Sequence, residues 1–183
     1  MSLHYTYLDN RAAITVSGPD RYDFLQELIT NDIQKVENGL VYACLLSPQG
    51  KFLFDFFIRQ EDEDLILECE GGERAEALLK KLKLYKLHSD VTLNLNNQDV
   101  WTLWGDMDLE HPRDPRHLDL GFRSYEKPEQ GKEAPFEAWD KHRISLCVPT
   151  GSRDLIPEKS TLSEGNMDAL NAIDYKKGCY VGQ

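Results

Sequence analysis

The sequence predicts an α+β fold in which antiparallel sheets carry packed helices. Short apolar segments bounded by turn-forming pairs such as Asp9-Asn10 and Asn38-Gly39 are typical of strands joined by tight connections. Two other segments repeat apolar residues at helical spacing. The resulting order is two strands, a helix, three strands and a second helix, which favours hairpins over parallel crossovers.

The first half of the chain, residues 1–89, contains all of these elements. One helix is indicated where Phe24 and Leu28 fall on one face with their apolar neighbours, and a second where Leu78 and Leu82 do so. The Asp9-Asn10 pair predicts that the first two strands form a hairpin. In chain order we expect strands over 5–8 and 11–16, a helix over 20–29, strands over 40–46, 51–59 and 65–69, and a helix over 75–85.

The second half, residues 90–183, begins with a further pair of strand-like segments around Asn96-Asn97. A segment rich in Pro and charged residues then predicts a loop, and a polar segment with Pro and Gly predicts a linker. In chain order we expect strands over 91–95 and 100–104, a loop over 106–116, a strand over 118–123, a linker over 127–132, and a helix over 135–143 that carries Trp139.

The net charge excludes one class of partner. Asp and Glu number 32 against 21 Lys and Arg, which gives a formal charge of −11 among 183 residues. This charge repels a phosphate backbone, so we expect no direct binding of nucleic acid. The length suffices for one domain or two small ones with a buried core, and we expect a monomer.

Neither a membrane segment nor a secretion signal is predicted. No window approaches 18 consecutive apolar residues, and the start of the chain lacks the basic and leucine-rich regions of a signal peptide. The four cysteines match no CxxC metal spacing and no compact disulfide framework. We therefore expect a cytoplasmic protein with reduced thiols and no membrane partner.

The strongest candidate for chemistry is Lys177-Gly178-Cys179. A thiol reacts as the thiolate, and a neighbouring ammonium together with main-chain N–H groups in a glycine turn stabilises that anion. Lys177 and Gly178 supply both elements. The tripeptide also fits a small buried cysteine beside a solvated lysine, so the motif by itself leaves both interpretations open.

A second candidate is Asp55, which interrupts the apolar segment 52–58. An unpaired buried carboxylate is costly, so this side chain either finds hydrogen-bond donors or reaches water. Strand alternation places it on the same face as Leu53 and Phe57. There it could accept hydrogen bonds from the N–H groups of a heterocycle; alternatively, it lies on an edge strand and faces water.

Motifs for other chemistries are missing from the sequence. The five histidines are not paired as in zinc sites, and no GxGxxG, GxxxxGK[ST] or GxSxG pattern occurs. The sequence therefore predicts no metal site, no dinucleotide or P-loop site and no nucleophile elbow.

The end of the chain resembles a known signature. Residues 162–183 finish on Lys177-Gly178-Cys179-Tyr180-Val181-Gly182-Gln183, which is similar to the motif Lys-Gly-Cys-aromatic-x-Gly-Gln-Glu of the YgfZ family. The final Glu would be the next residue, so we expect the chain to be truncated after Gln183. Further segments resemble the folate-binding domain that this family shares with the glycine-cleavage T-protein: Gly18-x-Asp20-Arg21-x-x-Phe24-Leu25, Thr30-Asn31-Asp32, Gly39-x-x-Tyr42 and Ser47-Pro48-Gln49-Gly50-Lys51.

The resemblance implies a duplicated folate-binding domain of antiparallel sheets with packed helices, as in aminomethyltransferases. Its first α+β half would be residues 1–89 and its second residues 90–183, and the C-terminal β-barrel of the family would be absent. The implied function is a tetrahydrofolate-binding accessory protein that supports assembly or repair of iron–sulfur clusters in client enzymes, and thereby tRNA modification. The implied ligand is tetrahydrofolate or a one-carbon derivative.

The resemblance also assigns roles to single residues. Cys179 would be the reactive thiol and Lys177 its activator, while Asp55, Gly178, Tyr180 and Gln183 would contact the folate or shape its site. No residue is expected to bind a resident metal.

The alternative function is that of an aminomethyltransferase, which transfers a one-carbon unit to tetrahydrofolate. T-proteins carry two adjacent aspartates at the position where this chain has Phe54-Asp55. Half of the acidic pair is therefore missing, which favours the fold of an aminomethyltransferase without its activity in glycine cleavage.

Overall fold

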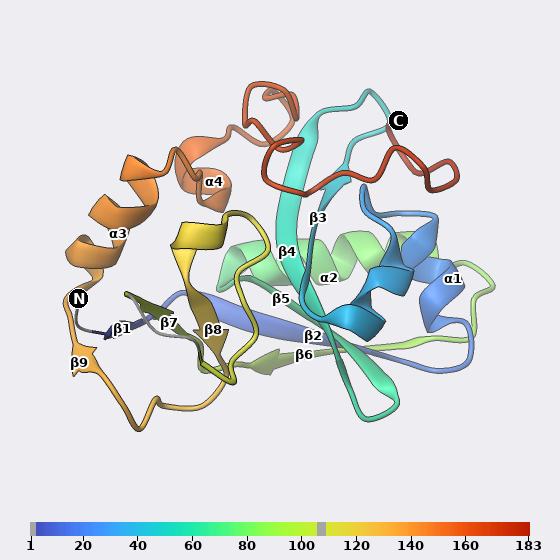
Figure 1. Ribbon diagram of the computed structural model, residues 1–183. Helices are drawn as coiled ribbons and strands as arrows, with labels where there is room; N and C mark the ends of the chain where they lie inside the picture. The colour runs from blue at the N-terminus through green and yellow to red at the C-terminus, as the bar shows by residue number, and fades with distance from the viewer. Residues whose placement is uncertain (1–2, 106–108) are drawn as a thin grey trace.

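The computed structural model describes residues 3–105 and 109–183. Its larger sheet has five strands in the order β3-β4-β5-β2-β6, and every neighbouring pair is antiparallel (Figure 1). The strands are β2 (Arg11–Ser17), β3 (Val41–Leu46), β4 (Phe52–Glu61), β5 (Asp64–Glu70) and β6 (Thr92–Asn97).

A smaller sheet of four strands has the order β8-β7-β1-β9. It consists of β1 (His4–Tyr7), β7 (Trp101–Trp104), β8 (Phe122–Ser124) and β9 (Lys132–Glu133). The β1–β7 and β7–β8 pairs are antiparallel, and the short β9 lies parallel to β1. The predicted α+β class built on antiparallel sheets is confirmed.

The remaining elements are helical. They are α1 (Arg21–Gln26), the 3-10 helix η1 (Ile33–Asn38), α2 (Glu73–Lys86), the 3-10 helix η2 (Leu118–Leu120), α3 (Phe136–Ser145) and α4 (Gly151–Asp154). The first predicted helix ends at Gln26 instead of residue 29, because Ile29 forms a bridge to Leu45 at the edge of the larger sheet.

The predicted strand over 118–123 is wrong in its first half, where η2 stands. Gly121 separates η2 from β8 with a φ of +101°, and a Cβ there would lie 2.0 Å from the carbonyl oxygen of Leu103. Only glycine fits both the conformation and the contact. Part of the predicted loop over 106–116, residues 106–108, lies outside the described residues.

The predicted hairpin of the first two strands is also wrong. β1 pairs with β7 and β2 with β5, so residues 8–10 connect two different sheets. The Leu8 N–H donates to the carbonyl of Val100, where the chain passes from β6 to β7. The division into halves at residues 89 and 90 stays a prediction, and each sheet contains one strand from the other half.

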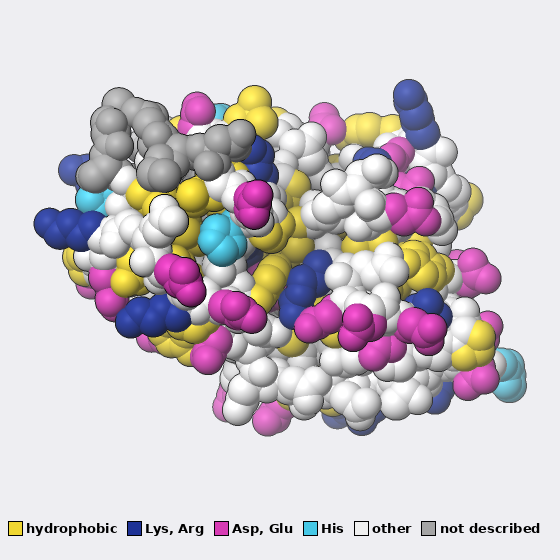
Figure 2. Space-filling view, turned by 60° about the horizontal axis from the view of Figure 1, so that its bottom comes forward, with side chains coloured by type: hydrophobic (Ala, Val, Ile, Leu, Met, Phe, Trp, Pro, Cys, Tyr) yellow, Lys and Arg dark blue, Asp and Glu magenta, His cyan; other side chains and the backbone are white. Residues whose placement is uncertain are grey.

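The larger sheet is covered on both faces. On one face α1, η1 and α2 pack against the alternate apolar residues of the strands, with Phe24, Ile33 and Leu78 in the shared core. On the other face a second apolar cluster joins Tyr42 and Phe57 to side chains of the smaller sheet, α3 and the C-terminal segment. Acidic side chains form a row across one surface of the molecule, in keeping with its net charge (Figure 2).

The strand β4 is buried on both faces, and a β-bulge decides which side chains lie where. The register between β3 and β4 shifts between Leu45 and Leu46. As a result Leu53 packs in the helix-covered core and Phe57 in the second cluster, so the prediction that both share the face of Asp55 is wrong for Leu53. The described part of the chain contains no helix that could span a membrane.

Candidate functional site

A cavity of about 450 Å³ lies on the second face of the larger sheet, beside the connection from β1 to β2. It combines aromatic walls with charged groups of both signs, a combination that binding sites for small organic molecules share. Its lining residues are Leu8, Asp9, Asn10, Arg11, Asp55, Phe57, Glu70, Arg116, Arg123, Phe136, Glu137, Trp139, Thr150, Gly151 and Arg153.

Phe57 forms the floor of this cavity and is surrounded by guanidinium groups. The Cζ atoms of Arg123, Arg116 and Arg11 lie 3.9, 4.9 and 5.9 Å from the centroid of its ring. The negative face of an aromatic ring attracts cations, so the ring and the arginines hold one another in place.

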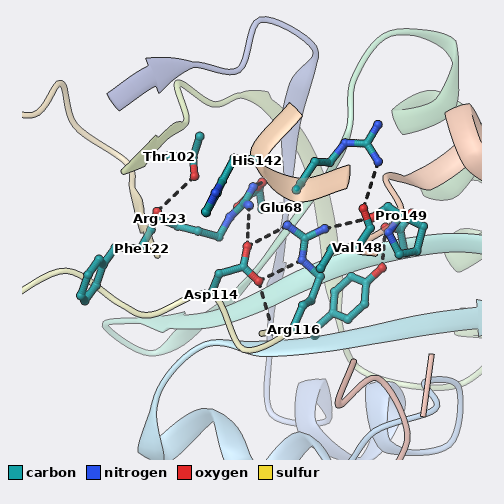
Figure 3. Close-up of polar contacts among 12 residues, drawn as sticks. Glu68, Thr102, Asp114, Arg116, Phe122, Arg123, His142, Val148 and Pro149 are labelled. Atoms are coloured by element: carbon teal, nitrogen blue, oxygen red, sulfur yellow. Dashed lines mark hydrogen bonds and ion pairs between the residues drawn. The ribbon is translucent and has the colours of Figure 1, made fainter. Parts of the chain in front are cut away.

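The same arginines belong to an ion cluster, defined here as Glu68, Asp114, Arg11, Arg116 and Arg123. Figure 3 labels all of its members except Arg11. Glu68 accepts from Arg11 Nε at 2.7 Å and from Arg123 Nε at 3.0 Å. Asp114 accepts from Arg116 Nη2 at 2.7 Å and from Arg123 Nη1 at 3.2 Å. Three guanidiniums face two carboxylates, so the cluster carries an excess of one positive charge beneath the cavity.

The ion cluster remains ionised because its members support one another. Burial alone would raise the pKa of Glu68, but Arg123 and Arg11 outweigh it and lower that pKa to about 2. Burial acts on Asp114 in the same direction, and Arg116 again lowers its pKa below the usual value. Burial and the charge of Glu68 raise the pKa of Tyr125, whose hydroxyl donates to Glu68 at 3.1 Å.

Asp55 lies in the wall of the cavity and is only 8% exposed, which rules out the interpretation that it faces water. Its Oδ2 accepts from the hydroxyl of Tyr42 at 2.8 Å. Burial and the charge of Asp55 raise the pKa of Tyr42 well above its ordinary value, so this hydroxyl stays protonated and donates. A folate-binding role for Asp55 stays a prediction, and its position in the cavity wall is compatible with it.

The second oxygen of Asp55 faces a backbone position that must be small. A Cβ on Gly151 would lie 3.1 Å from Asp55 Oδ1 and 3.1 Å from Glu70 Oε2. The φ of Gly151 is +43°, which also favours glycine. Glu70 is held by the hydroxyl of Ser152, which donates to it at 2.8 Å. Two carboxylates therefore converge on one side of the cavity.

The Cys179 segment, defined here as residues 171–183, lies away from this cavity lining, across the ends of β3 and β4 and beside α1 (Figure 1). Gly178, Cys179 and Gln183 are exposed, and Tyr180 packs against the cluster that contains Tyr42. The structure thus places Asp55 in the cavity and Gly178, Tyr180 and Gln183 outside its lining. Their predicted roles toward a folate remain predictions.

Lys177 differs from its neighbours because its side chain is buried. Its Nζ donates to the carbonyls of Gln26, Ile29 and Asn31 at 2.6, 2.5 and 2.9 Å. Burial lowers the pKa of Lys177 to about 8, so the amine is still protonated at neutral pH. Its predicted role as activator of the Cys179 thiol stays a prediction.

The other end of the signature contacts a second segment of the resemblance. Gly182 has a φ of +82°, and a Cβ there would lie 2.2 Å from the carbonyl oxygen of Ser47. A Cβ on Gly50 would in turn lie 3.0 Å from the carbonyl oxygen of Gly182. The Ser47-Pro48-Gln49-Gly50 turn and the Cys179 segment are therefore in direct contact. The sequence could not predict this contact, because the two segments lie far apart in the chain.

The cysteines differ in exposure. Cys44 and Cys69 are buried, and Cys147 and Cys179 are exposed. Burial raises the pKa of Cys44 well above its ordinary value and that of Cys69 to about 12, so neither is a thiolate at neutral pH. Among the described residues no group of three or more His, Cys, Asp or Glu is arranged to hold a metal ion.

Sequence reasoning missed the ion cluster. Glu68 offered a signal, because it stands in an apolar strand segment as Asp55 does. Arg116 and Asp114 offered none, since they come from a segment read only as a charged loop. Their pairing depends on tertiary structure.

The fold is that of an aminomethyltransferase over much of its length. Glycine cleavage system aminomethyltransferase T from Bartonella henselae superposes with a TM-score of 0.52 over 58% of this chain and 30% of that chain, at 18% sequence identity. This match confirms the predicted fold class. No family model matches the chain.

Curated relatives cover nearly the whole chain. It is 31% identical over 98% of its length to a protein of Pyricularia oryzae named iron-sulfur cluster assembly factor IBA57 homolog, mitochondrial. It is 32% identical over 97% to the homolog of Neurospora crassa, and 30% identical over 96% to the human iron-sulfur cluster assembly factor IBA57, mitochondrial. The chain spans 52, 48 and 59% of these proteins, which is about half of their length.

The expectation of a cytoplasmic location is wrong in the light of these relatives. Each of them is named as a mitochondrial protein. Composition and cysteine spacing describe a folded chain with reduced thiols, a state that more than one compartment maintains, so these signals could not distinguish the two locations.

The pKa of Glu68 predicts how stability depends on pH. Its folded value of about 2 lies below the ordinary value of 4.5, so its stabilisation is complete above pH 4.5 and is lost as the pH falls from there toward 2. We expect the free energy of unfolding to decrease by about 3 kcal/mol across this range. Denaturant unfolding followed by tryptophan fluorescence at a series of pH values measures it.

Two variants test this assignment. Glu68→Gln should lower stability at pH 7 by about 3–5 kcal/mol, because it leaves buried guanidiniums unpaired, and should flatten the slope below pH 4.5. Glu63→Gln, at the exposed turn between β4 and β5, is the control and should leave both unchanged. An unaltered pH slope in Glu68→Gln would contradict the assignment.

Proposed function

We propose that this protein supports the assembly or repair of iron–sulfur clusters in client enzymes, and that it does so in mitochondria. The observation that carries the proposal is the identity of 30–32% to iron-sulfur cluster assembly factors over 96–98% of the chain. A deficit in tRNA modification would follow indirectly, where a modifying enzyme needs such a cluster. The cluster is cargo in this proposal, and the client enzymes are the protein partners.

The ligand of the cavity, in this proposal, is tetrahydrofolate or a one-carbon derivative. The fold of an aminomethyltransferase and the volume of about 450 Å³ support it, because the volume suits a molecule of that size. Asp55 would accept from N–H groups of the ring system, and Phe136 and Trp139 would supply apolar walls. Arg153, half exposed at the cavity, would receive carboxylates of the glutamate tail.

The thiol of this function, in this proposal, is Cys179, which stands in the Lys177-Gly178-Cys179 motif and is exposed. A single thiol cannot complete the set of ligands that a cluster needs. Contact with a cluster would therefore be transient or shared with ligands of a partner protein, or the thiol would serve redox chemistry instead. Cys44 and Cys69 are buried and cannot join it without unfolding.

The alternative is an aminomethyltransferase, which the fold itself favours. The structure separates the two positions that correspond to the acidic pair: Asp55 lies in the cavity wall, and Phe54 packs in the core on the opposite face of β4. Half of the acidic pair is therefore absent, and the carboxylate that lies beside Asp55 in the cavity is that of Glu70, from β5.

We expect no aminomethyl transfer. The assay supplies an aminomethyl-lipoyl carrier protein and tetrahydrofolate, and measures release of ammonia and formation of methylene-tetrahydrofolate. An authentic T-protein is the positive control. Catalytic turnover that Asp55→Ala abolishes would establish the alternative function.

Folate binding is tested by anaerobic titration with tetrahydrofolate, with Trp139 in the cavity wall as the fluorescent reporter. We expect saturable quenching, and about ten- to hundredfold weaker binding in Asp55→Asn, which loses a charge-assisted hydrogen bond. Asp62→Asn, at the exposed turn after β4, is the control. A flat titration of the folded protein would remove folate from the proposal, and equal affinity in Asp55→Asn would remove Asp55 from the site.

The role of the thiol is tested by complementation of a strain that lacks the protein. We expect Cys179→Ser to lose complementation while folate titration and thermal unfolding remain as in the wild type. Cys147→Ser, which removes the other exposed cysteine, is the matched control and should complement. Full complementation by Cys179→Ser would show that the thiol is dispensable.

A further inference from the structure

The buried ammonium of Lys177 stands in contrast to the segment around it. Lys176, Gly178 and Cys179 are exposed, whereas the Lys177 side chain is 9% exposed. Lysine is almost never buried without partners for its charge. The structure must therefore give this ammonium a specific set of acceptors.

Those acceptors are main-chain carbonyls at the end of α1 and in the turn that follows. An ammonium has three protons, and the carbonyls of Gln26, Ile29 and Asn31 accept one each, at 2.6, 2.5 and 2.9 Å. The last carbonyls of a helix lack partners within the helix, and a cation is favourable there. All protons of the group are thus used, and none is left for a thiolate.

The segment before Lys177 is attached to the same turn. The Thr30 hydroxyl donates to the carbonyl of Ala172 at 2.6 Å, and the Asp174 N–H donates to the carbonyl of Thr30 at 3.0 Å. The Asn31 amide donates to the carbonyl of Asn171 at 2.7 Å. These hydrogen bonds therefore fix the chain as far as Asp174, three residues before Lys177.

The segment after Cys179 returns to the same helix. The N–H of Val181 donates to the carbonyl of Glu27 at 3.2 Å. Cys179 thus lies on a short exposed turn whose two ends are both bound to residues 26–31, and Lys177 donates three of the hydrogen bonds in that attachment.

We infer that Lys177 is a positioning residue: its ammonium fixes the turn that presents Cys179 by binding the carbonyls of Gln26, Ile29 and Asn31, and it does not act on the thiol itself. The inference rests on the proposed function in one respect, namely that Cys179 is the working thiol. It replaces electrostatic activation with a geometric role for the lysine next to it.

The experiment compares Lys177→Met with Lys176→Met, the neighbouring exposed lysine. Hydrogen exchange of the amides of Asp174 and Val181 reports on the attachment, and the pH profile of Cys179 alkylation by iodoacetamide reports on activation. We expect exchange at both amides to be at least tenfold faster in Lys177→Met and unchanged in Lys176→Met. The pH midpoint of alkylation should be the same in all three proteins.

Two results would overturn the inference. Wild-type exchange rates in Lys177→Met would show that the lysine does not hold the turn. A midpoint that rises by one pH unit or more in Lys177→Met, but not in Lys176→Met, would show that it activates the thiol. Cys147, the other exposed cysteine, is the internal reference for the alkylation chemistry.

The remaining cysteines report on folding in the same samples. Cys44 and Cys69 are buried and should resist alkylation in every folded variant. If Lys177→Met exposes these cysteines, Lys177→Gln replaces it as the test variant, because the glutamine amide keeps two donors for the three carbonyls. In Lys177→Gln we expect faster exchange of the two amides while Cys44 and Cys69 stay protected. Wild-type exchange rates in Lys177→Gln would overturn the inference. None of these readouts needs cluster assembly. Complementation by Cys179→Ser would therefore remove the thiol from the proposed function, while hydrogen exchange and alkylation would still decide the role of Lys177.

Discussion

The ion pair between Glu68 and Arg123 connects the two sheets, because Glu68 lies on β5 of the larger sheet and Arg123 on β8 of the smaller one. Buried charges of this kind stabilise a structure only when each has its full set of partners, and the removal of one leaves the others uncompensated. Here the partners extend to Arg11 and to Asp114 with Arg116, and the three guanidiniums surround Phe57 at the floor of the cavity. The position of the sheets and the shape of the cavity floor therefore depend on the same set of contacts.

The sequence predicted most of the helices and strands, but it predicted fewer of the pairings between strands. Local patterns of apolar residues located the strands around Ile14, Phe56 and Leu67 and the helix of Leu78, because such a pattern is visible within each segment alone. The prediction of a hairpin at Asp9-Asn10 was wrong because a turn signal indicates only that the chain bends. It does not determine which sheet the next strand joins. The segments at 8–10 and 98–100 both cross from one sheet to the other, and their contact through Leu8 and Val100 is long-range.

Of the candidate site, too, the sequence predicted some residues but not the contacts that they make. Asp55 could be found from the sequence because a carboxylate between phenylalanines needs partners, and the structure supplies Tyr42. Lys177 was found through its place beside a cysteine, yet the three carbonyls that bind it lie about 150 residues earlier in the chain, where no local pattern marks them. Exposure separated Cys179 from Cys44, and exposure is a property of the folded chain alone. The bulge that turns Leu53 away from Asp55 could not be predicted either, because the prediction assumed that side chains alternate strictly along the strand.

The close contact between Gly182 and the carbonyl oxygen of Ser47 means that the two turns share one volume, which holds a hydrogen on the Cα of Gly182 and has no room for a methyl group there. A larger residue at position 182 therefore changes both turns. Damage to the tight turn between β3 and β4 reaches the end of the Cys179 segment through steric contact, without passing through the cavity. Residue 182 is separated from residue 47 by most of the chain, but the two pack as a single site. The effects of substitutions at the two positions on stability should therefore not be additive.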